Sequence, residues 1–277
     1  MKKGTFWTRK RLIAAACIAG AVLILLIAFL CWNPYGWGEE PDPTEPTVPT
    51  TEATEPTQES STEETTEPEP TEPVMLEEFV ELYEQNPDIA GWIRIDGTVV
   101  DYPVMYTPED EEKYIHADFE GNYDTNGVPF IAGDCSLDPE SDNLIIHGHN
   151  MMSGKMFASL LNYAYKSYWK AHPIIEFSTL YENRQYEIVA AFYDRLYTKY
   201  YTGFKYYQFI DAEDEEHFQA AMDYYKDKAC YETGVEAEYG DRLITLVTCS
   251  WHTKYGRFVV VGREVKPETQ IPETTAP

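Results

Sequence analysis

The sequence predicts a mainly β domain, folded as a closed or nearly closed β-barrel with a helix at its start and an added helix before its last two strands. Three observations predict this fold. Short apolar runs recur between residues 91 and 265, separated by turn-forming residues. Helical periodicity covers few segments. The last two runs, Leu243–Val247 and Phe258–Val261, are apolar on both faces, as buried barrel strands are.

The elements follow in order from these patterns. Residues 75–85 place apolar side chains at helical intervals, and this first helix is expected to end near Asn86-Pro87. Residues 91–95 and 99–104 form a predicted hairpin around the turn at Asp96-Gly97. The remaining predicted elements are strands at 129–132 and 143–147, a short helix at 156–165, a strand pair at 174–177 and 185–193, a helix at 211–229, and strands at 242–249 and 257–265.

The helix at 211–229 has the strongest signal of the three. Acidic residues crowd its first turn and lysines its last, which suits the helix dipole. Phe218, Met222 and Tyr225 lie along one stripe, so this face is expected to pack on the barrel.

The N-terminal part of the chain predicts a membrane anchor. Residues 1–11 are a basic tail, and residues 12–32 are an uncharged apolar stretch, long enough to cross a bilayer as a helix of about 20 residues. Basic residues before such a span favour a cytoplasmic N-terminus, which places the domain outside the cell. The alternative is a cleaved signal peptide, but such a peptide has an apolar region of about 7–15 residues, and no small-residue cleavage site ends this one.

A stalk without a fold is expected between the anchor and the domain, over residues 33–74. From residue 39 to 74 it contains proline, threonine and acidic residues in abundance and no Lys or Arg. Such a composition buries too little apolar surface to offset the entropy of ordering, and like-charge repulsion extends it. The domain then spans 75–266, followed by a disordered tail at 267–277.

Charge and cysteine content exclude several functions. The formal net charge is −27, and an acidic domain repels phosphates, so nucleic acid is not expected as a partner. No C-x-x-C motif occurs, which disfavours a structural zinc site. The three cysteines of the domain, Cys135, Cys230 and Cys249, allow at most one internal bridge. A Cys135–Cys230 bridge is possible, but the sequence does not establish it.

The candidate chemistry rests on a thiol and a guanidinium. Cys249 ends one predicted strand and Arg257 begins the next. If the two strands are antiparallel neighbours joined by a loop at 250–256, these residues face one another with Cβ atoms roughly 5 Å apart. Each alone is more often structural, because a lone cysteine is usually a small buried hydrophobe and an arginine beside a strand usually points into solvent. Together they suit thiol-based acyl transfer.

Such a thiol also needs a histidine base. His147 and His149 flank Gly148 at the end of a predicted strand, and His252 lies in the loop after Cys249. An H-x-H pair can also bind a metal, but no third ligand is indicated, so we do not expect a metal here.

Several motifs are shared with one enzyme family. They are Thr245-Leu246-Val247-Thr248-Cys249, Arg257 on the following strand, Gly148-His149-Asn150-Met151, Gly91-Trp92-Ile93, Asp101-Tyr102-Pro103-Val104 and Met152-Ser153-Gly154-Lys155-Met156-Phe157. In these the chain resembles the sortases, most closely class B, over about 75–265. It departs from them at His147, where class B members commonly have tyrosine.

The resemblance implies a membrane-anchored cysteine transpeptidase that cleaves a C-terminal sorting signal after threonine. The signal is carried by a secreted protein, and sortases read pentapeptides such as L-P-x-T-G or N-P-x-T-N. The acyl group then passes to an amine of a peptidoglycan precursor or of a pilin. The resemblance also implies that no organic cofactor takes part. The resemblance assigns catalysis to His149, Cys249 and Arg257, and Thr248 and Ser250 are candidate substrate-binding residues. Two alternatives stay open: a cell-wall cysteine peptidase that hydrolyses, and a non-catalytic binding module presented on a stalk.

Overall fold

The computed structural model describes residues 73–266. The predicted basic tail, the anchor, almost all of the stalk and the tail at 267–277 lie outside the described residues. Within 73–266, no helix combines the length and the apolar character needed to cross a bilayer.

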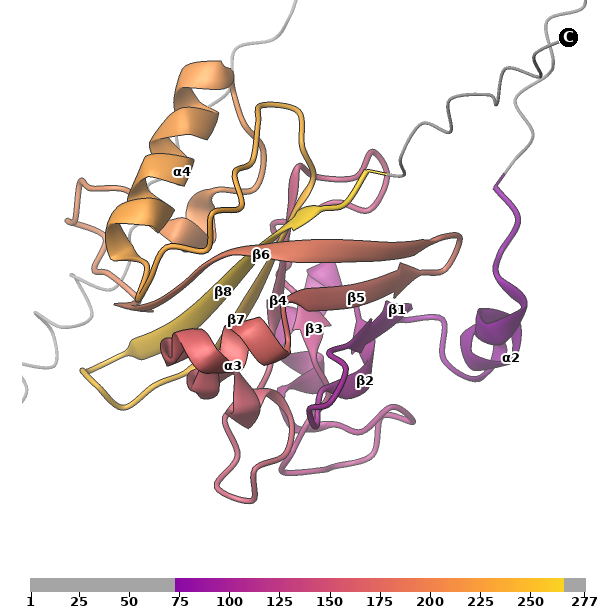
Figure 1. The fold of residues 1–277 in the computed structure, drawn as a ribbon. Coiled ribbons are helices and arrows are strands. Elements are labelled where there is room, and N and C mark those ends of the chain that lie inside the picture. Colours follow the sequence, from indigo (N-terminus) through magenta and orange to yellow (C-terminus); the bar gives the residue numbers. More distant parts are fainter. Residues whose placement is uncertain (1–72, 267–277) are drawn as a thin grey trace, which may run out of the picture. The chain divides into compact units, whose positions relative to one another are not determined.

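The predicted closed barrel is confirmed. Eight strands of the described part close in the order β1-β2-β3-β4-β7-β8-β6-β5, as Figure 1 shows. The strands are β1 Ile89–Arg94, β2 Asp101–Met105, β3 Phe130–Ile131, β4 Asn143–His147, β5 Ile174–Thr179, β6 Asn183–Arg195, β7 Leu243–Cys249 and β8 Gly256–Glu264.

The predicted β1–β2 hairpin forms as an antiparallel pair with Arg94 opposite Asp101. Its turn needs glycine, because Gly97 has φ of 72°, a left-handed conformation that other residues rarely adopt. Asp96 and Gly97 therefore reverse the chain where the sequence indicated.

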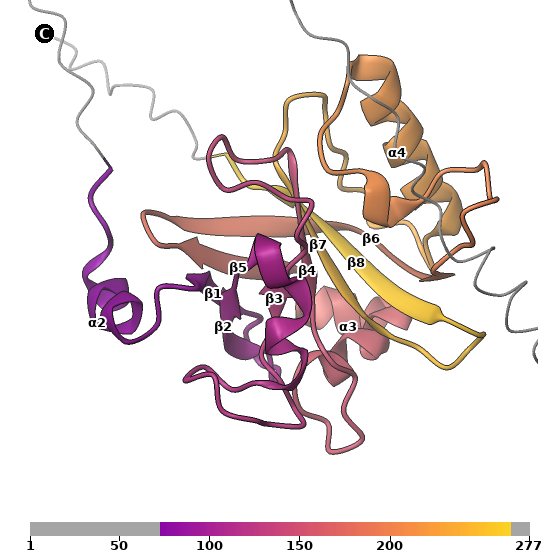
Figure 2. The ribbon, with the colours of Figure 1, turned by 180° about the vertical axis from the view of Figure 1, so that it is seen from behind.

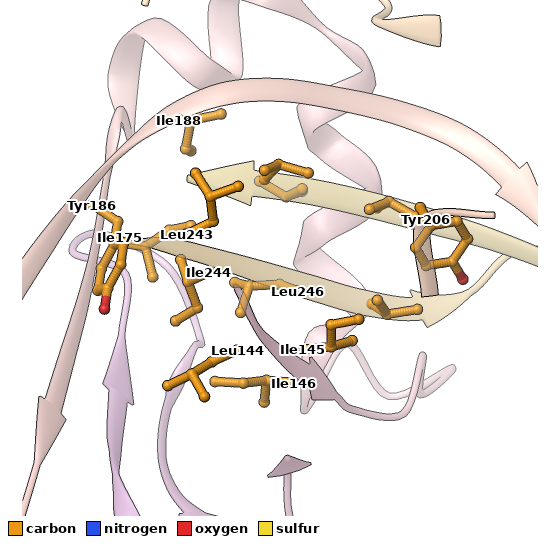
Figure 3. Close-up of a cluster of buried hydrophobic side chains, with 14 of the residues drawn as sticks. Leu144, Ile145, Ile146, Ile175, Tyr186, Ile188, Tyr206, Leu243, Ile244 and Leu246 are labelled. Carbon is orange, nitrogen blue, oxygen red and sulfur yellow. The ribbon is translucent and has the colours of Figure 1, made fainter. Parts of the chain in front are cut away.

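Strand β7 lies between two partners of opposite direction. It pairs in parallel with β4 and antiparallel with β8. Every residue of β7 before Cys249 is buried, which explains why the strand is apolar on both faces. Figure 3 shows side chains of β7 and β4 packed beside one another in the main core, among them Leu246 and Ile146.

Three α-helices surround the described barrel: α2 Glu77–Gln85, α3 Lys166–Ala171 and α4 Glu215–Lys228. Three 3₁₀ segments accompany them: η1 Pro108–His116, η2 Phe157–Ala164 and η3 Tyr206–Gln208. Helix α4 packs against β6, as seen from both sides in Figures 1 and 2. Its predicted stripe of Phe218, Met222 and Tyr225 is buried.

Two helix predictions need correction. The helix predicted at 156–165 is the 3₁₀ segment η2, since the extended Tyr165 (φ −106°, ψ 124°) ends it before α3 begins at Lys166. The helix predicted from residue 211 begins at Glu215, because Asp214 caps it by accepting a hydrogen bond from the backbone N–H of His217. Segments η1, α3 and η3 were not predicted.

Candidate active site

Cys249 and Arg257 face each other, as their spacing predicted. Cys249 is the last residue of β7 and pairs in register with Arg257, near the start of β8. Directly opposed residues project to the same face of a sheet, with Cβ atoms about 5 Å apart. Both side chains are half-buried, so each reaches the surface of the same groove.

The connection between the two strands is a tight one. The backbone N–H of Ser250 donates to the carbonyl oxygen of Gly256 at 3.0 Å. A Cβ on Gly256 would lie 2.3 Å from the Ser250 carbonyl oxygen, so only glycine allows this approach. His252 lies in this loop, with its Nδ1 3.1 Å from the Ser250 hydroxyl and its ring edge-on to Tyr193.

Three hydrogen bonds join the histidine segment to the cysteine strand. The backbone N–H of Gly148 donates to the Val247 carbonyl oxygen at 3.0 Å. The Thr248 hydroxyl donates to the Gly148 carbonyl oxygen at 2.7 Å, and the Asn150 side-chain amide donates to the Cys249 carbonyl oxygen at 2.8 Å. His149, between these contacts, is therefore fixed relative to Cys249.

The His149 ring is also held from its other side. Its Nε2 lies 2.8 Å from the carbonyl oxygen of Ile115. A carbonyl oxygen only accepts, so Nε2 carries the hydrogen, and Nδ1 of the neutral ring is left to exchange a proton. The ring stacks on that of His116, with centroids 5.5 Å apart and planes 17° apart. Ile115 and His116, the two partners of the His149 ring, both belong to η1. The sequence could not predict the contact with Ile115, because every residue has a backbone carbonyl.

His147 is the last residue of β4 and is held by strand pairing and an aromatic neighbour. It pairs in register with Val247 and its ring packs against Phe130 with centroids 5.6 Å apart. Burial first, and then the positive charge of Arg257, lower the pKa of His147 to about 4. This histidine is therefore neutral at physiological pH.

One groove of about 520 Å³ brings the predicted catalytic residues together. Its walls include His149, Cys249 and Arg257, together with His147 and Thr248. Ser250 is not among the lining residues, and it is buried. The Arg257 guanidinium donates through Nη1 to the carbonyl oxygens of Gly256 and Tyr255, at 3.1 and 3.5 Å. Its remaining N–H donors make no other hydrogen bond within residues 73–266.

The remaining walls of the groove differ in character. Acidic side chains line one part, namely Glu111, Glu112 and Asp134, while Leu196, Tyr197 and Tyr207 line another. Burial raises the pKa of Glu111, and so does repulsion from Asp134 and Glu112. The described cysteines are all unbridged, with Cys135 buried and Cys230 exposed. Residues 73–266 hold no group of three or more His, Cys, Asp or Glu arranged for a metal ion.

Comparison with known proteins identifies the family of this chain. Residues 93–265 match the family model of the Sortase domain. The chain belongs to the sortase family. It is 31% identical over 191 residues to sortase B of Listeria monocytogenes, covering 68% of this chain and 74% of that protein. This sortase is therefore a cysteine transpeptidase, and its likeness to class B is confirmed.

The fold resembles those of solved class B sortases, among them the following two. The Staphylococcus aureus sortase B–substrate complex superposes with a TM-score of 0.62 at 29% identity, covering 69% of this chain and 86% of that one. A sortase B complexed with triglycine superposes with a TM-score of 0.60 at 30% identity, covering 68% and 85%. The resemblance thus extends over most of the described domain.

The stability of this sortase should fall as His147 is titrated. The unfolded chain takes up a proton near pH 6.5, whereas folded His147 does so only near pH 4. The free energy of unfolding should therefore decrease by up to about 3 kcal/mol between pH 6.5 and 4 from this group. Urea denaturation at a series of pH values measures the slope. His147→Tyr should flatten this part of the curve, and an unchanged slope in that variant would contradict the assignment.

Gly148 is expected to be required for the position of His149. A Cβ at this residue would lie 2.6 Å from ring atoms of Phe157, which is fully buried. Gly148→Ala should therefore displace the histidine segment and lower the acylation rate about a hundredfold, the effect of a misplacement near 1 Å. Adding Phe157→Leu should recover part of the loss. Stopped-flow acylation with a cleavable peptide measures both, and a Gly148→Ala enzyme of wild-type rate would refute the explanation.

Proposed function

We propose that this chain is a membrane-anchored class B sortase that cleaves a sorting signal after threonine and transfers the acyl group to an amine of the cell wall or of a pilin. The observation that carries the proposal is the pairing of Cys249 with Arg257 across β7 and β8, in a groove that His149 also lines. The expected anchor at 12–32 and stalk at 33–74 would place this groove outside the cell, at a distance from the membrane.

The reaction would proceed in two halves at this groove. His149 takes the thiol proton at Nδ1 and the Cys249 sulfur attacks the threonine carbonyl carbon. The carbon–nitrogen bond then breaks as His149 passes that proton to the leaving amine. The acceptor amine then attacks the thioester, and His149 takes up the proton that this amine loses. The carbon–sulfur bond breaks, and the proton returns to the departing sulfur, which restores the Cys249 thiol. A free thiol is only a few per cent thiolate at neutral pH, so a histidine close to the sulfur matters for the first half.

Arg257 would stabilise the negative oxygen in both halves. Its N–H groups not bound to Gly256 and Tyr255 are free to meet the substrate's carbonyl oxygen as charge develops on it. Loss of one such donor typically raises the barrier by about 2.7–4 kcal/mol. A planar guanidinium suits this role better than an ammonium, because its donors keep a fixed direction.

The assignment of Thr248 and Ser250 to substrate binding stays a prediction. The hydroxyl of Thr248 donates to the Gly148 carbonyl oxygen, and Ser250 is 4% exposed. Contacts with a bound peptide are better supplied by the apolar and aromatic wall at Leu196, Tyr197 and Tyr207. That wall suits an extended peptide because it offers broad apolar faces with hydroxyl groups at their edges.

The acidic wall of the groove supports an amine as acceptor. Glu111, Glu112 and Asp134 concentrate negative charge there, and the raised pKa of Glu111 reflects burial first and then that crowding. A charged wall of this kind raises the local concentration of a cationic amine. Triglycine, present in one of the solved relatives, carries a free terminal amine of this kind.

The decisive experiment is product analysis with the full-length chain in detergent. A library of sorting pentapeptides is presented with and without an added amine, and products are identified by mass spectrometry. We expect a thioester to Cys249 and a transpeptidation product that requires the amine. Hydrolysis indifferent to the amine would favour a cell-wall peptidase. If a thiol reagent labels Cys249 and no peptide of the library prevents this labelling, the result would favour a binding module.

Neutralising the acidic wall should weaken capture of the acceptor. We expect Glu111→Gln/Glu112→Gln to raise the KM for a diamine acceptor several-fold, because the attraction of the groove for a cation falls. The matched control is Glu109→Gln/Asp110→Asn, which removes the same charge from exposed residues of η1 that do not line the groove. Steady-state transfer at varied amine concentration measures both. Equal KM values for the two double variants would contradict capture by the wall.

A further inference from the structure

Asp194 is a buried carboxylate beside the site, and the reaction steps above do not use it. It lies near the end of β6 with 4% of its surface exposed. No basic side chain of residues 73–266 lies within 4.0 Å of its oxygens, in contrast to the buried Asp241, which pairs with Lys266. Burying a charge is unfavourable unless hydrogen bonds satisfy it, so the contacts of Asp194 need an explanation.

Three donors satisfy the Asp194 carboxylate. Oδ1 accepts from the hydroxyl of Tyr197 and from the backbone N–H of Arg195, both at 2.8 Å. Oδ2 accepts from the hydroxyl of Tyr224 at 2.6 Å. Burial and the bond to Asp194 raise the pKa of Tyr224 far above its ordinary value, so this hydroxyl remains a donor. Each oxygen therefore has a tyrosine hydroxyl bound to it.

The strand register places this carboxylate next to the catalytic pair. Asp194 is directly opposite Arg257 in the β6–β8 ladder, and Arg257 is directly opposite Cys249 in the β7–β8 ladder. The three residues form a row across adjacent strands, and residues in such a row project to one face. The neighbouring row, with Tyr193 and Phe258 in ring contact at 4.7 Å, lies on the other face.

Arg257 does not form an ion pair with this neighbour. Within the described residues, its guanidinium donates to the backbone carbonyls of Tyr255 and Gly256 and not to Asp194. The carboxylate already accepts three hydrogen bonds, from two tyrosine hydroxyls and the backbone N–H of Arg195. At most one of its roughly four lone-pair sites remains, too few for a bidentate arginine contact. The anion therefore attracts the guanidinium through space without taking up its donors.

We propose that Asp194 is a positioning residue, a buried anion that holds the guanidinium of Arg257 beside Cys249 and leaves its N–H donors free for the substrate carbonyl. This inference rests on the proposed function for its catalytic meaning. The two tyrosines that bind the Asp194 carboxylate come from different parts of the fold. Tyr197 belongs to the groove wall, and Tyr224 belongs to α4, so this network links the added helix to the catalytic arginine.

The first test observes Arg257 itself and needs no turnover. In the full chain, ¹H–¹⁵N NMR resolves arginine Nε–H groups, and Arg257→Lys identifies the signal. We expect the Arg257 signal to exchange with solvent at least tenfold faster in Asp194→Asn than in the wild type, because an amide of the same shape carries no charge. The matched control Asp241→Asn alters an equally buried carboxylate away from the groove, and it should leave the signal unchanged.

The second test measures acylation on the same variants. Asp194→Asn should lower the single-turnover rate about tenfold at saturating peptide with little change in KM, whereas Asp241→Asn should keep the wild-type rate even if it is less stable to urea. Tyr224→Phe frees one carboxylate oxygen to bind Arg257, so it should also slow acylation, and adding it to Asp194→Asn should cause no further loss.

The outcomes separate the inference from the proposed function. An Asp194→Asn chain with unchanged Arg257 exchange refutes the positioning role, whatever the enzyme catalyses. Equal acylation losses in Asp194→Asn and Asp241→Asn also refute it, because the effect would then be general destabilisation. A wild-type chain that forms no thioester with any library peptide, yet shows the expected NMR change, supports the positioning of Arg257 and refutes the proposed reaction.

Discussion

Cys249→Ala is expected to abolish formation of the acyl-enzyme and cleavage of sorting peptides. The sulfur supplies the bond to the substrate, and neither water nor a neighbouring side chain in the groove replaces it. Removing a nucleophile that works with a base lowers kcat by a factor on the order of 10⁶ in well-studied enzymes. Intact-protein mass spectrometry after mixing with peptide detects the thioester, and chromatography detects the cleaved product.

The chain contains a matched control for this variant. Cys230 is an exposed, unbridged thiol of the same domain, and it does not line the groove. Cys230→Ala should keep wild-type acylation. Cys135 is a poorer control because it is buried in the core, and burial raises its pKa to about 11. Cleavage by Cys249→Ala at an appreciable fraction of the wild-type rate would remove Cys249 from the chemistry altogether.

His149→Ala is expected to show the second large effect, a loss of about 10²–10⁴ in kcat, the range for general acid–base catalysis. The contact of Nε2 with Ile115 fixes the ring, so the proton must move through Nδ1. A single-turnover assay separates the two halves of the reaction, and both should slow, since the leaving amine gains a proton and the acceptor loses one.

The neighbouring histidine is the appropriate comparison. His147→Ala should retain most activity, because burial keeps His147 neutral down to about pH 4. His252→Ala should do the same, since His252 contacts Ser250 and Tyr193 outside the groove. If the His147→Ala enzyme were inactive and the His149→Ala enzyme active, the acid–base role would belong to His147 instead of His149.

The sequence predicted the strands that carry the site residues better than it predicted the groups that hold those residues in place. Strand β4 matches its predicted bounds at 143–147, and the facing of Cys249 and Arg257 followed from two apolar runs and the loop between them. Such features are local, because alternation and spacing within one hairpin determine them. The parallel pairing of β4 with β7 joins residues about a hundred positions apart, and periodicity carries no information about which strands pair.

The less predictable parts of the site depend on backbone atoms and irregular segments. The partner of His149 is the carbonyl of Ile115, a group that every residue possesses. Segment η1, which supplies it, is a 3₁₀ segment with a non-helical residue at Asp110, so no helical periodicity marks it. Asp194 lies one residue beyond the strand predicted at 185–193, in the part of β6 that the sequence did not predict. Its hydrogen-bond partners Tyr197 and Tyr224 come from a loop and a distant helix.

Because β7 is paired on both sides, the position of Cys249 is fixed more firmly than the positions of the groove walls. Cys249 extends from a strand hydrogen-bonded on both sides and buried along its length, so local opening there approaches the cost of global unfolding and its amides should exchange slowest. The groove walls at Glu111, Tyr197 and Tyr207 come from short 3₁₀ segments and connecting loops. Mutations in these walls can therefore change which peptide is accepted while the reacting atoms keep their places.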